Sequence, residues 1–196
     1  CGIAIAVPVM ILLVLLLTLI NTLAGGALTP NITDPNVTKW LTFNVSWGSA
    51  RGGTWAAGAR CFWEADFLHK IFGVGPDCLY AFLSNEGSVG LQTMVNDRFG
   101  GNRLTNAHNE WLTTLINLGA LGTAAYAAVF LTALRKYRRN SMAIMLLFTY
   151  GMYSLISFQQ VLNTPFFFLL LGVCEAEQRM NQQYNTDTHE ESIEVG

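Results

Sequence analysis

Charged residues are missing from three long stretches of the chain, and these gaps are the clearest pattern in the sequence. The charge-free stretches are residues 1–33, 111–134 and 140–174. A helix of about 20 apolar residues crosses roughly 30 Å of hydrocarbon. The run over 3–23, rich in Leu, Ile and Val, therefore predicts one membrane span, and 111–134 predicts a second.

The third charge-free stretch is too long for a single span. Near its middle lie two glutamines at 159–160 and, shortly afterwards, Pro165, which together have the composition of a turn. We therefore expect a hairpin of two short helices, over 141–158 and 162–175. The predicted fold class is an all-α polytopic membrane protein with about four transmembrane helices and a long extracytoplasmic loop that contains a helix.

The orientation of these spans follows from the single dense basic cluster in the chain. That cluster is Arg135-Lys136-Tyr137-Arg138-Arg139. Basic clusters beside membrane spans remain in the cytoplasm, so both ends of the chain are expected there and residues 24–110 outside. The tail over 176–196 is polar and acidic, which predicts a disordered cytoplasmic segment.

The first apolar run has a competing interpretation as a secretory signal peptide. Against it, the chain has no initiator Met and no basic region before the run, and the run is longer than the apolar part of a signal peptide. Because the chain starts at Cys1 inside an apolar stretch, we expect it to be the C-terminal part of something longer.

Composition narrows the class of protein further. Only 12% of the 196 residues are charged and 52% are hydrophobic, whereas about a quarter of the residues in a soluble domain are charged. A net charge of −2 argues against a basic surface for nucleic acid. The low charge, together with 12% aromatic residues, argues against a disordered chain.

The predicted outer segment is much longer than a connection between helices needs to be. Its first part carries N-x-S/T sequons at Asn31, Asn36 and Asn44. These would accept glycans in a eukaryotic secretory protein, and they are ordinary loop composition in a bacterium. Residues 52–68 have an apolar face at helical spacing, which predicts a helix along the membrane interface, where Trp is favoured.

The cysteines and one of the histidines offer no metal site. Cys1, Cys61, Cys78 and Cys174 lack the C-x-x-C or Cys/His spacing of metal ligands, and no metal or cofactor is expected. Cys61 and Cys78 share the outer segment, so a disulfide and two buried thiols both remain open. His69 is expected to complement the dipole at a helix end rather than to bind a ligand.

His108 is the principal catalytic candidate. It lies where a polar loop meets the second predicted span, and Thr105 or Asn106 can cap that helix, which would place His108 in the first turn at the outer membrane surface. An imidazole at this place can accept a proton near neutral pH and can meet both lipid-linked and aqueous reactants. The alternative is an ordinary polar anchor at the membrane interface.

Arginines in the outer segment provide candidates for binding phosphate. Arg51 and Arg60 flank the start of the predicted outer helix, among small and aromatic residues. A guanidinium matches phosphate oxygens in pairs, so either can contact a lipid pyrophosphate; lipid headgroups or nearby Glu64 are the alternative partners. Arg98 and Arg103 are further candidates, although an ion pair with Asp97 or plain solvation is the favoured interpretation.

Three motifs occur in a fixed order around these candidates. They are Arg51-Gly-Gly-Thr-Trp55, then Phe72-Gly-Val-Gly-Pro-Asp77, then Ala107-His108-Asn109-Glu110-Trp111-Leu112 followed by Leu118-Gly-Ala-Leu-Gly122. In combination they resemble the O-antigen ligase and O-antigen polymerase superfamily of bacterial envelope glycan assembly, over roughly residues 45–175. The resemblance implies that His108 and Arg51 are catalytic. It also suggests four substrate-binding candidates, namely Arg60, Asn109, Arg103 and Asp77.

The resemblance implies a membrane glycosyltransferase of the ligase type in the bacterial cytoplasmic membrane. Arg51, with Arg60, would contact the pyrophosphate of a polyprenyl-linked glycan donor. His108 would activate a hydroxyl of a lipid, glycan or protein acceptor outside the membrane. Members of that family also use arginine from earlier spans, which this chain lacks. The expected partners are therefore the donor, the acceptor and membrane lipid, with no nucleic acid and no cofactor.

Two other functions compete with the ligase. A repeat-unit polymerase of the same superfamily would use similar residues and differ in its acceptor. A transporter or assembly subunit would instead use the outer segment to bind a partner. The predicted spans carry no charged residue of the kind that marks an ion pathway, which favours an enzyme over a transporter.

Overall fold

The structure is a computed structural model that describes residues 2–100, 103–138, 140–157 and 164–194. Every regular element in these ranges is a helix, which confirms the all-α part of the predicted fold class. The helices are α1 (Gly2–Leu23), α2 (Pro35–Leu41), α3 (Trp47–Glu64), α4 (Phe67–Phe72), α5 (Leu79–Asn85), α6 (Val89–Phe99), α7 (Glu110–Lys136), α8 (Ser141–Ile156) and α9 (Thr164–Glu194).

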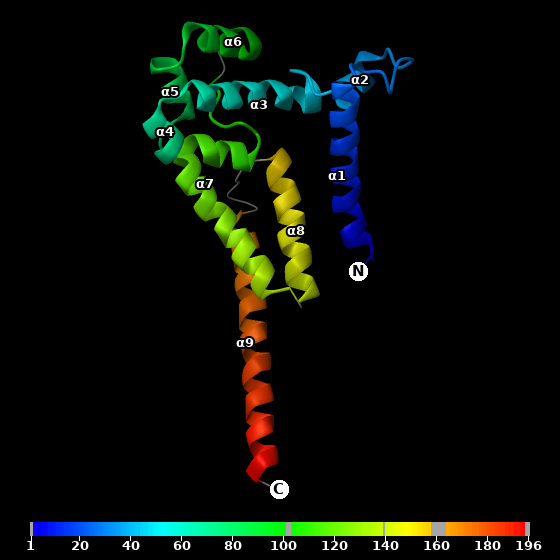
Figure 1. Cartoon of the computed structure of the whole chain (residues 1–196), viewed down its shortest axis with the longest axis vertical. Coiled ribbons are helices and arrows are strands. Elements are labelled where there is room, and N and C mark those ends of the chain that lie inside the picture. The colour runs from blue at the N-terminus through cyan, green and yellow to red at the C-terminus, as the bar shows by residue number, and fades with distance from the viewer. Residues whose placement is uncertain (1, 101–102, 139, 158–163, 195–196) are drawn as a thin grey trace.

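The described helices form an upper layer and a set of helices that descend from it (Figure 1). α3 lies across the top, with α2 near one end and α4, α5 and α6 near the other. α1, α8, α9 and the later part of α7 run roughly perpendicular to α3, in alternating directions along the chain. The described part of the chain therefore begins and ends on the side away from α3.

α7 changes direction at Gly119. This residue has φ 68° and ψ −170° inside the helix, a conformation open to glycine and strained for other residues. The N–H groups of Val74 and Gly75 donate to the carbonyls of Ile116 (2.9 Å) and Asn117 (3.0 Å). The break in α7 frees these carbonyls from their helical partners. Before the break α7 runs nearly parallel to α3, and after it α7 descends (Figure 1).

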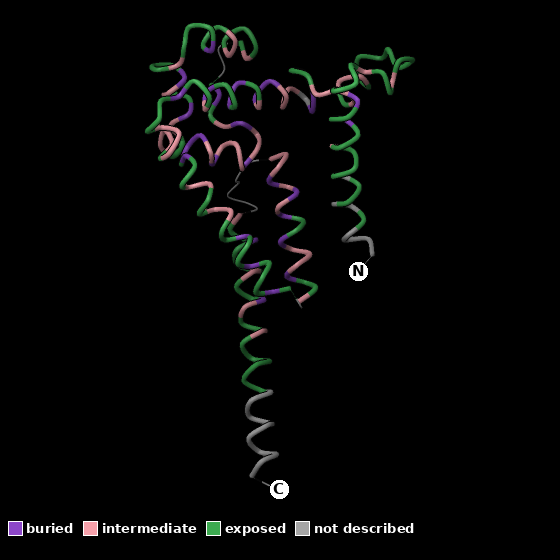
Figure 2. Tube along the Cα trace, in the orientation of Figure 1, coloured by how far each residue is buried: buried purple, intermediate pink, exposed green. Residues whose placement is uncertain are grey.

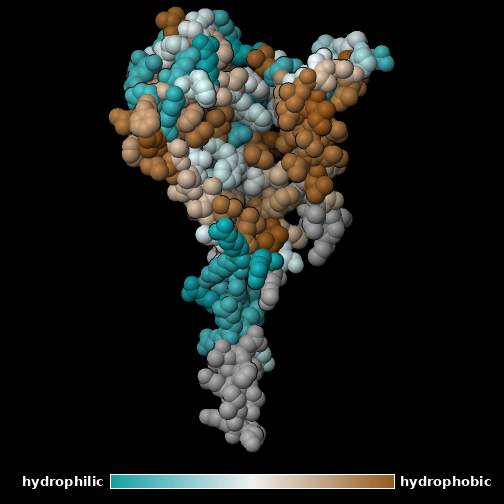
Figure 3. Space-filling view, in the orientation of Figure 1, coloured by the Kyte–Doolittle hydropathy of each residue, from teal (hydrophilic) through white to brown (hydrophobic). Residues whose placement is uncertain are grey.

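Among the described residues, α7 is the one helix that is both long and apolar enough to cross a membrane. A helix with the length and composition of α7 also occurs in the core of soluble proteins, and shorter apolar helices here are Leu12–Leu23 and Ser141–Ile156. After the bend, residues 120–136 measure about 25 Å at 1.5 Å per residue. Figure 3 shows that the visible face of α1 is largely apolar.

Two clusters of buried residues hold the helices together (Figure 2). The first cluster joins α3, α5, α6 and α7 and contains Ala57, Cys61, Leu79, Leu83, Leu91, Leu104, Ala107 and Ile116. The second lies between α7, α8 and α9 and contains Phe130, Ala133, Tyr137, Ala143, Leu147, Tyr150, Phe167 and Cys174. In the second cluster the rings of Tyr150 and Phe167 stack with centroids 4.0 Å apart.

α9 is tied to the end of α7 and is longer than the sequence predicted. The carboxylate of Glu175 accepts hydrogen bonds from Lys136 Nζ (2.7 Å) and from the Tyr137 hydroxyl. Arg179, one turn later on α9, donates its Nε to Glu175 at 2.7 Å. The prediction of disorder was wrong for residues 176–194, because α9 continues through Glu194. The Glu, Gln, Arg and Met residues of this segment favour helix.

The outer segment departs from the sequence prediction in its helix boundaries. The helix predicted over 52–68 begins earlier and ends at Glu64. Asp66 then caps the separate helix α4 by accepting the backbone N–H of His69 at 2.8 Å. His69 Nδ1 also lies 2.9 Å from the Asp66 carboxylate, as suits a side chain that stabilises a helix.

The sequence left open a disulfide between Cys61 and Cys78 and predicted a hairpin turn after α8. Cys61 and Cys78 are free thiols, so the structure contains no disulfide between them; Cys61 is buried in the first cluster. The turn predicted around 159–165 falls mainly on 158–163, which lie outside the described residues.

Candidate functional site

The start of α3 is built around two glycines. A Cβ atom at Gly52 would lie 1.9 Å from the backbone oxygen of Asn44, and one at Gly53 would lie 3.2 Å from that of Val45. The loop before α3 therefore packs directly on the helix backbone, and the N–H of Gly53 donates to Val45 at 3.0 Å. Arg98 of α6 secures the same loop by donating Nη2 to the Val45 carbonyl at 2.6 Å.

The next two side chains of α3 hold the segment that carries His108. Thr54 donates its hydroxyl to the carbonyl of Ala107 at 3.0 Å, and Trp55 donates Nε1 to the carbonyl of His108 at 3.4 Å. The N–H of His108 donates to Asn106 Oδ1 at 3.1 Å. His108 has φ 51°, which non-glycine residues rarely adopt, and these three bonds hold it there.

Asn109 caps α7, so the predicted cap at Thr105 or Asn106 was wrong. Asn109 Oδ1 accepts the N–H of Leu112 at 2.9 Å, while Nδ2 donates to the carbonyl of Leu155 near the end of α8 at 2.8 Å. His108 accordingly lies just before the helix rather than in its first turn. Asn109 joins the ends of two helices at this place.

Arg51 reaches from α3 to the same end of α8. Its Nε donates to the carbonyl of Ile156 at 3.0 Å, and its Nη1 donates to that of Gly48 at 2.8 Å. Among the described residues, no acceptor binds Nη2. Burial, and secondly the charge of Arg51, lower the pKa of His108. The imidazole is therefore neutral at pH 7 and able to accept a proton.

An apolar groove, here called the α1–α8 groove, includes Arg51 in its lining. It has a volume of 340 Å³ and is lined by Met10, Val14, Leu15, Trp40, Trp47, Gly48, Arg51 and Ile156. Among the described residues that line the groove, Arg51 alone is charged, and the others belong to α1, α2, the start of α3 and the end of α8. A ligand with an apolar chain and an anionic end would match this groove.

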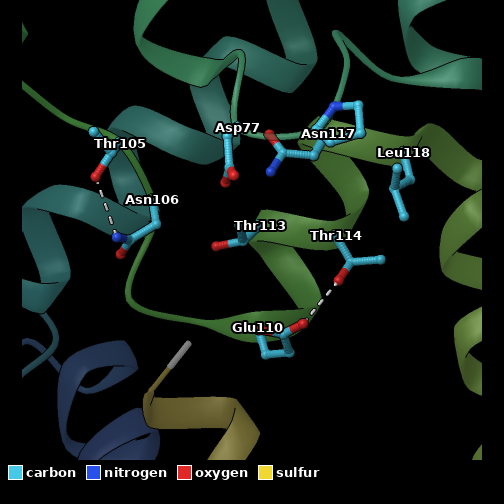
Figure 4. Close-up of a pocket in the computed structure, with 9 residues that line it drawn as sticks. Asp77, Thr105, Asn106, Glu110, Thr113, Thr114, Asn117 and Leu118 are labelled. Carbon is cyan, nitrogen blue, oxygen red and sulfur yellow. Dashed lines mark hydrogen bonds between the residues drawn. The ribbon is translucent and has the colours of Figure 1, made fainter. Parts of the chain in front are cut away.

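A separate polar pocket, here called the α7 pocket, lies beside the first segment of α7 (Figure 4). It has a volume of 340 Å³ and is lined by Pro76, Asp77, Thr105, Asn106, Glu110, Thr113, Thr114, Asn117 and Leu118. Asp77 enters the pocket from the turn after α4 and has φ 55°, a backbone conformation that Asp tolerates better than most residues. The structure thus places this predicted substrate-binding residue in a pocket that does not include Arg51 or His108.

Four polar residues from one face of α7 line this pocket. Glu110, Thr113, Thr114 and Asn117 follow the i, i+3, i+4, i+7 spacing of a helix face. Glu110 and Asn117 are only 4% and 8% exposed. Sequence reasoning missed all four as site residues, although polar side chains at helical spacing at the start of an apolar span were a visible signal.

Arg60 lies away from His108. It is nine residues after Arg51 on α3, which is about two and a half helical turns, so the two side chains leave opposite faces of the helix. Arg60 Nε pairs with the carboxylate of Glu64 at 2.6 Å. The hydrogen bond from Ser88 and the one from Arg60 lower the pKa of Glu64, which keeps this pair charged.

Arg103 also lies outside the group around His108. Its side chain is exposed, with the guanidinium carbon 5.2 Å from the ring centre of Tyr80 on α5. Of the residues predicted to form the site, the structure therefore brings together Arg51, His108 and Asn109.

The described residues contain no group of three or more His, Cys, Asp or Glu side chains placed to hold a metal ion. In comparisons with known proteins, no family model, curated protein or solved structure matches the chain. A proposal of function therefore rests on the residues and the geometry around Arg51, His108 and Asn109.

Proposed function

We propose that this chain is a membrane glycosyltransferase of the ligase type. It transfers a glycan from a polyprenyl-pyrophosphate donor to an acceptor hydroxyl outside the cytoplasmic membrane. One observation carries the proposal: Arg51 and Asn109, the neighbour of His108, both donate to carbonyls at the end of α8, beside an apolar groove whose lining includes Arg51 and Ile156. Two of the three motifs that resemble the O-antigen ligase and polymerase superfamily meet here, because Thr54 and Trp55 of the first donate to the carbonyls of Ala107 and His108 in the third.

Arg51 suits the leaving group of this reaction. Breaking the glycosidic bond to a polyprenyl pyrophosphate leaves a diphosphate with an additional negative charge. A guanidinium stabilises that charge by pairing with phosphate oxygens, and no metal ion is required. The α1–α8 groove, whose lining is apolar except for Arg51, would receive the polyprenyl chain.

His108 suits the role of general base. Its imidazole takes the proton of the acceptor hydroxyl as the hydroxyl oxygen attacks the anomeric carbon of the donor. The bond between that carbon and the pyrophosphate oxygen breaks, and its electron pair leaves with the diphosphate. A single displacement of this kind inverts the anomeric centre. The lowered pKa of His108 keeps the base neutral at physiological pH.

The proposed membrane arrangement follows the helix directions. α1, α8, the descending part of α7 and the first part of α9 would cross the bilayer, with residues 24–110 on the outer side. Arg135 and Lys136 lie at the end of α7 away from α3 (Figure 1), which would be the cytoplasmic side. The site at the end of α8 would then face the outer surface.

A repeat-unit polymerase of the same superfamily is the second candidate. The α7 pocket favours it, because this pocket offers carboxylate, amide and hydroxyl groups close along the chain to His108. Both candidates use the same donor and the same base. They differ only in whether the acceptor is a growing glycan or another molecule.

Transfer in lipid nanodiscs tests this proposal. The chain is incubated with a synthetic polyprenyl-pyrophosphate oligosaccharide and with lipid, peptide or glycan acceptors, and products are measured by mass spectrometry. His108→Ala should reduce transfer by about 10²–10⁴-fold while donor binding persists. Arg51→Ala should weaken donor binding, whereas Arg60→Ala, on the opposite face of α3, serves as its matched comparison and should retain it.

Two results would contradict the assignment of residues. Transfer by a folded His108→Ala variant at the rate of the unmodified chain would exclude the imidazole as base. Equal donor affinity in Arg51→Ala and Arg60→Ala would exclude the proposed pyrophosphate contact.

A further inference from the structure

The α7 pocket contains polar groups that are costly to bury, and the proposed transfer step does not use them. Asn117 is 8% exposed, and its Oδ1 is buried with no hydrogen-bond partner among the described residues. In Figure 4 its amide points toward Asp77, into the pocket. A buried acceptor without a partner loses its hydration and gains nothing in return, so a ligand that donates a hydrogen bond would satisfy it.

The charge of the lining limits what this ligand can be. Asp77 and Glu110 both contribute carboxyl groups, and the described residues of the lining include no Lys, Arg or His. An anionic group such as phosphate would be repelled here. A metal ion is also disfavoured, because the described residues contain no cluster of three or more metal-binding side chains. Neutral groups that donate hydrogen bonds fit this lining best.

The remaining side chains fit a ring that carries several hydroxyl groups. Asn106 and Asn117 carry amides that both donate and accept, and the threonine hydroxyls do the same. Pro76 and Leu118 add apolar surface, against which the C–H face of a sugar can pack. The volume of 340 Å³ lies in the range of small-molecule sites, about 300–1,000 Å³.

The position of the pocket connects it to His108. Asn106 and Glu110, two residues before and after His108, both line the pocket. His108 itself lies near Arg51, outside the lining. The segment 106–110 therefore borders the α7 pocket through Asn106 and Glu110 and carries His108 between them.

We propose that the α7 pocket binds one neutral sugar ring through its hydroxyl groups, with Asp77, Glu110 and Asn117 as acceptors. Its further role, to hold a sugar of the acceptor while His108 deprotonates the reacting hydroxyl, rests on the proposed function. Sugar binding by itself does not depend on the donor or on the transfer reaction.

Binding of simple glycosides to the chain in nanodiscs tests this proposal without any donor. The probes are the methyl glycosides of glucose, galactose and N-acetylglucosamine, and glucuronate and glucose 6-phosphate are the anionic comparisons. Saturation-transfer NMR gives the affinities. The neutral glycosides should bind saturably, and the anionic sugars should bind about tenfold more weakly or worse, since a tenfold change corresponds to about 1.4 kcal/mol.

Three variants assign the binding to the pocket. Asn117→Leu should lower the affinity for the neutral glycosides about tenfold. Asn96→Leu, the same change at an exposed position of α6, should leave that affinity unchanged. Asp77→Asn should reduce the discrimination against anionic sugars. This change keeps a residue that tolerates positive φ, and the position is exposed, so the variant remains informative if Asn117→Leu does not fold.

The outcomes separate this inference from the proposed function. No saturable binding, a preference for anionic sugars, or equal affinity in Asn117→Leu and Asn96→Leu would overturn the sugar site. Saturable binding that depends on Asn117, in a chain that transfers no glycan, would retain the pocket and reject the transferase. Transfer of a glycan by a chain that binds none of the glycosides would retain the transferase and reject the sugar site.

Discussion

Replacing Gly119 with alanine tests whether the bend in α7 is required. Gly119 has φ 68° and ψ −170°, a region essentially restricted to glycine, in which a residue with a Cβ is strained by about 1–2 kcal/mol. The added Cβ would lie 2.2 Å from the backbone oxygen of Ile71 and 2.5 Å from the nitrogen of Gly73. At such distances the two backbones must separate, which would break the hydrogen bonds from Val74 and Gly75 to α7, about 0.5–1.5 kcal/mol each.

The expected loss in the free energy of unfolding is about 2–5 kcal/mol, the sum of these terms. Gly151→Ala in α8 is the matched control, because no atom lies within 4 Å of the Cβ position there. In a helix interior Ala is favoured over Gly by roughly 0.5–1 kcal/mol, so Gly151→Ala should keep or raise the stability. Reversible denaturant titration in detergent, followed by circular dichroism, measures both variants.

The result that would refute this reasoning is a Gly119→Ala variant as stable as the unmodified chain. A difference below about 0.5 kcal/mol, the usual effect of a surface substitution, would mean that α7 runs straight past this position. The turn after α4 would then not be held by the carbonyls of α7, and the α7 pocket would lose the wall that carries Asp77.

Three further predictions concern single side chains. Burial and the charge of Arg51 hold the pKa of His108 below its usual value. The unfolded imidazole binds its proton at higher pH than the folded one, so acidification below about pH 6.5 should lower the free energy of unfolding. Arg51→Gln should move the NMR titration of the imidazole to higher pH; an unchanged titration would contradict their proximity. Asn109→Ala should cost about 1–2 kcal/mol in the same denaturant titration, because α7 loses its cap and its bond to α8; no loss would mean that this cap is dispensable. Burial raises the pKa of Cys61 to about 11, so maleimide at pH 7.5 should label Cys78 well before Cys61; equal rates would contradict the packing of α3.

The sequence predicted the apolar helices well and their interruption poorly. The helices expected over 3–23 and 141–158 correspond closely to α1 and α8, because runs of apolar residues without charge determine both. The break at Gly119 depends on a contact with the turn after α4. A glycine within an apolar run does not reveal such a contact, so the break in α7 could not be predicted from the sequence.

The candidate site was predictable in part. The placement of the start of α3 against the segment that carries His108 depends on contacts between distant parts of the chain, and only the resemblance suggested it. The separation of Arg60 from Arg51, in contrast, follows from helical periodicity and was available in the sequence. The polar face that begins at Glu110 was available for the same reason, and it was missed because the span was judged by its apolar residues.

The carboxyl end of α8 is held by side chains from elsewhere in the chain. Arg51 and Asn109 donate to the carbonyls of Ile156 and Leu155, which have no partner inside the helix. Truncating Arg51 therefore removes both a positive charge and a hydrogen bond that holds the last turn of α8. Lost turnover in such a variant would reflect either loss. Citrulline, introduced by semisynthesis, has nearly the shape of arginine and retains the Nε–H donor without the charge, and it would separate the two contributions.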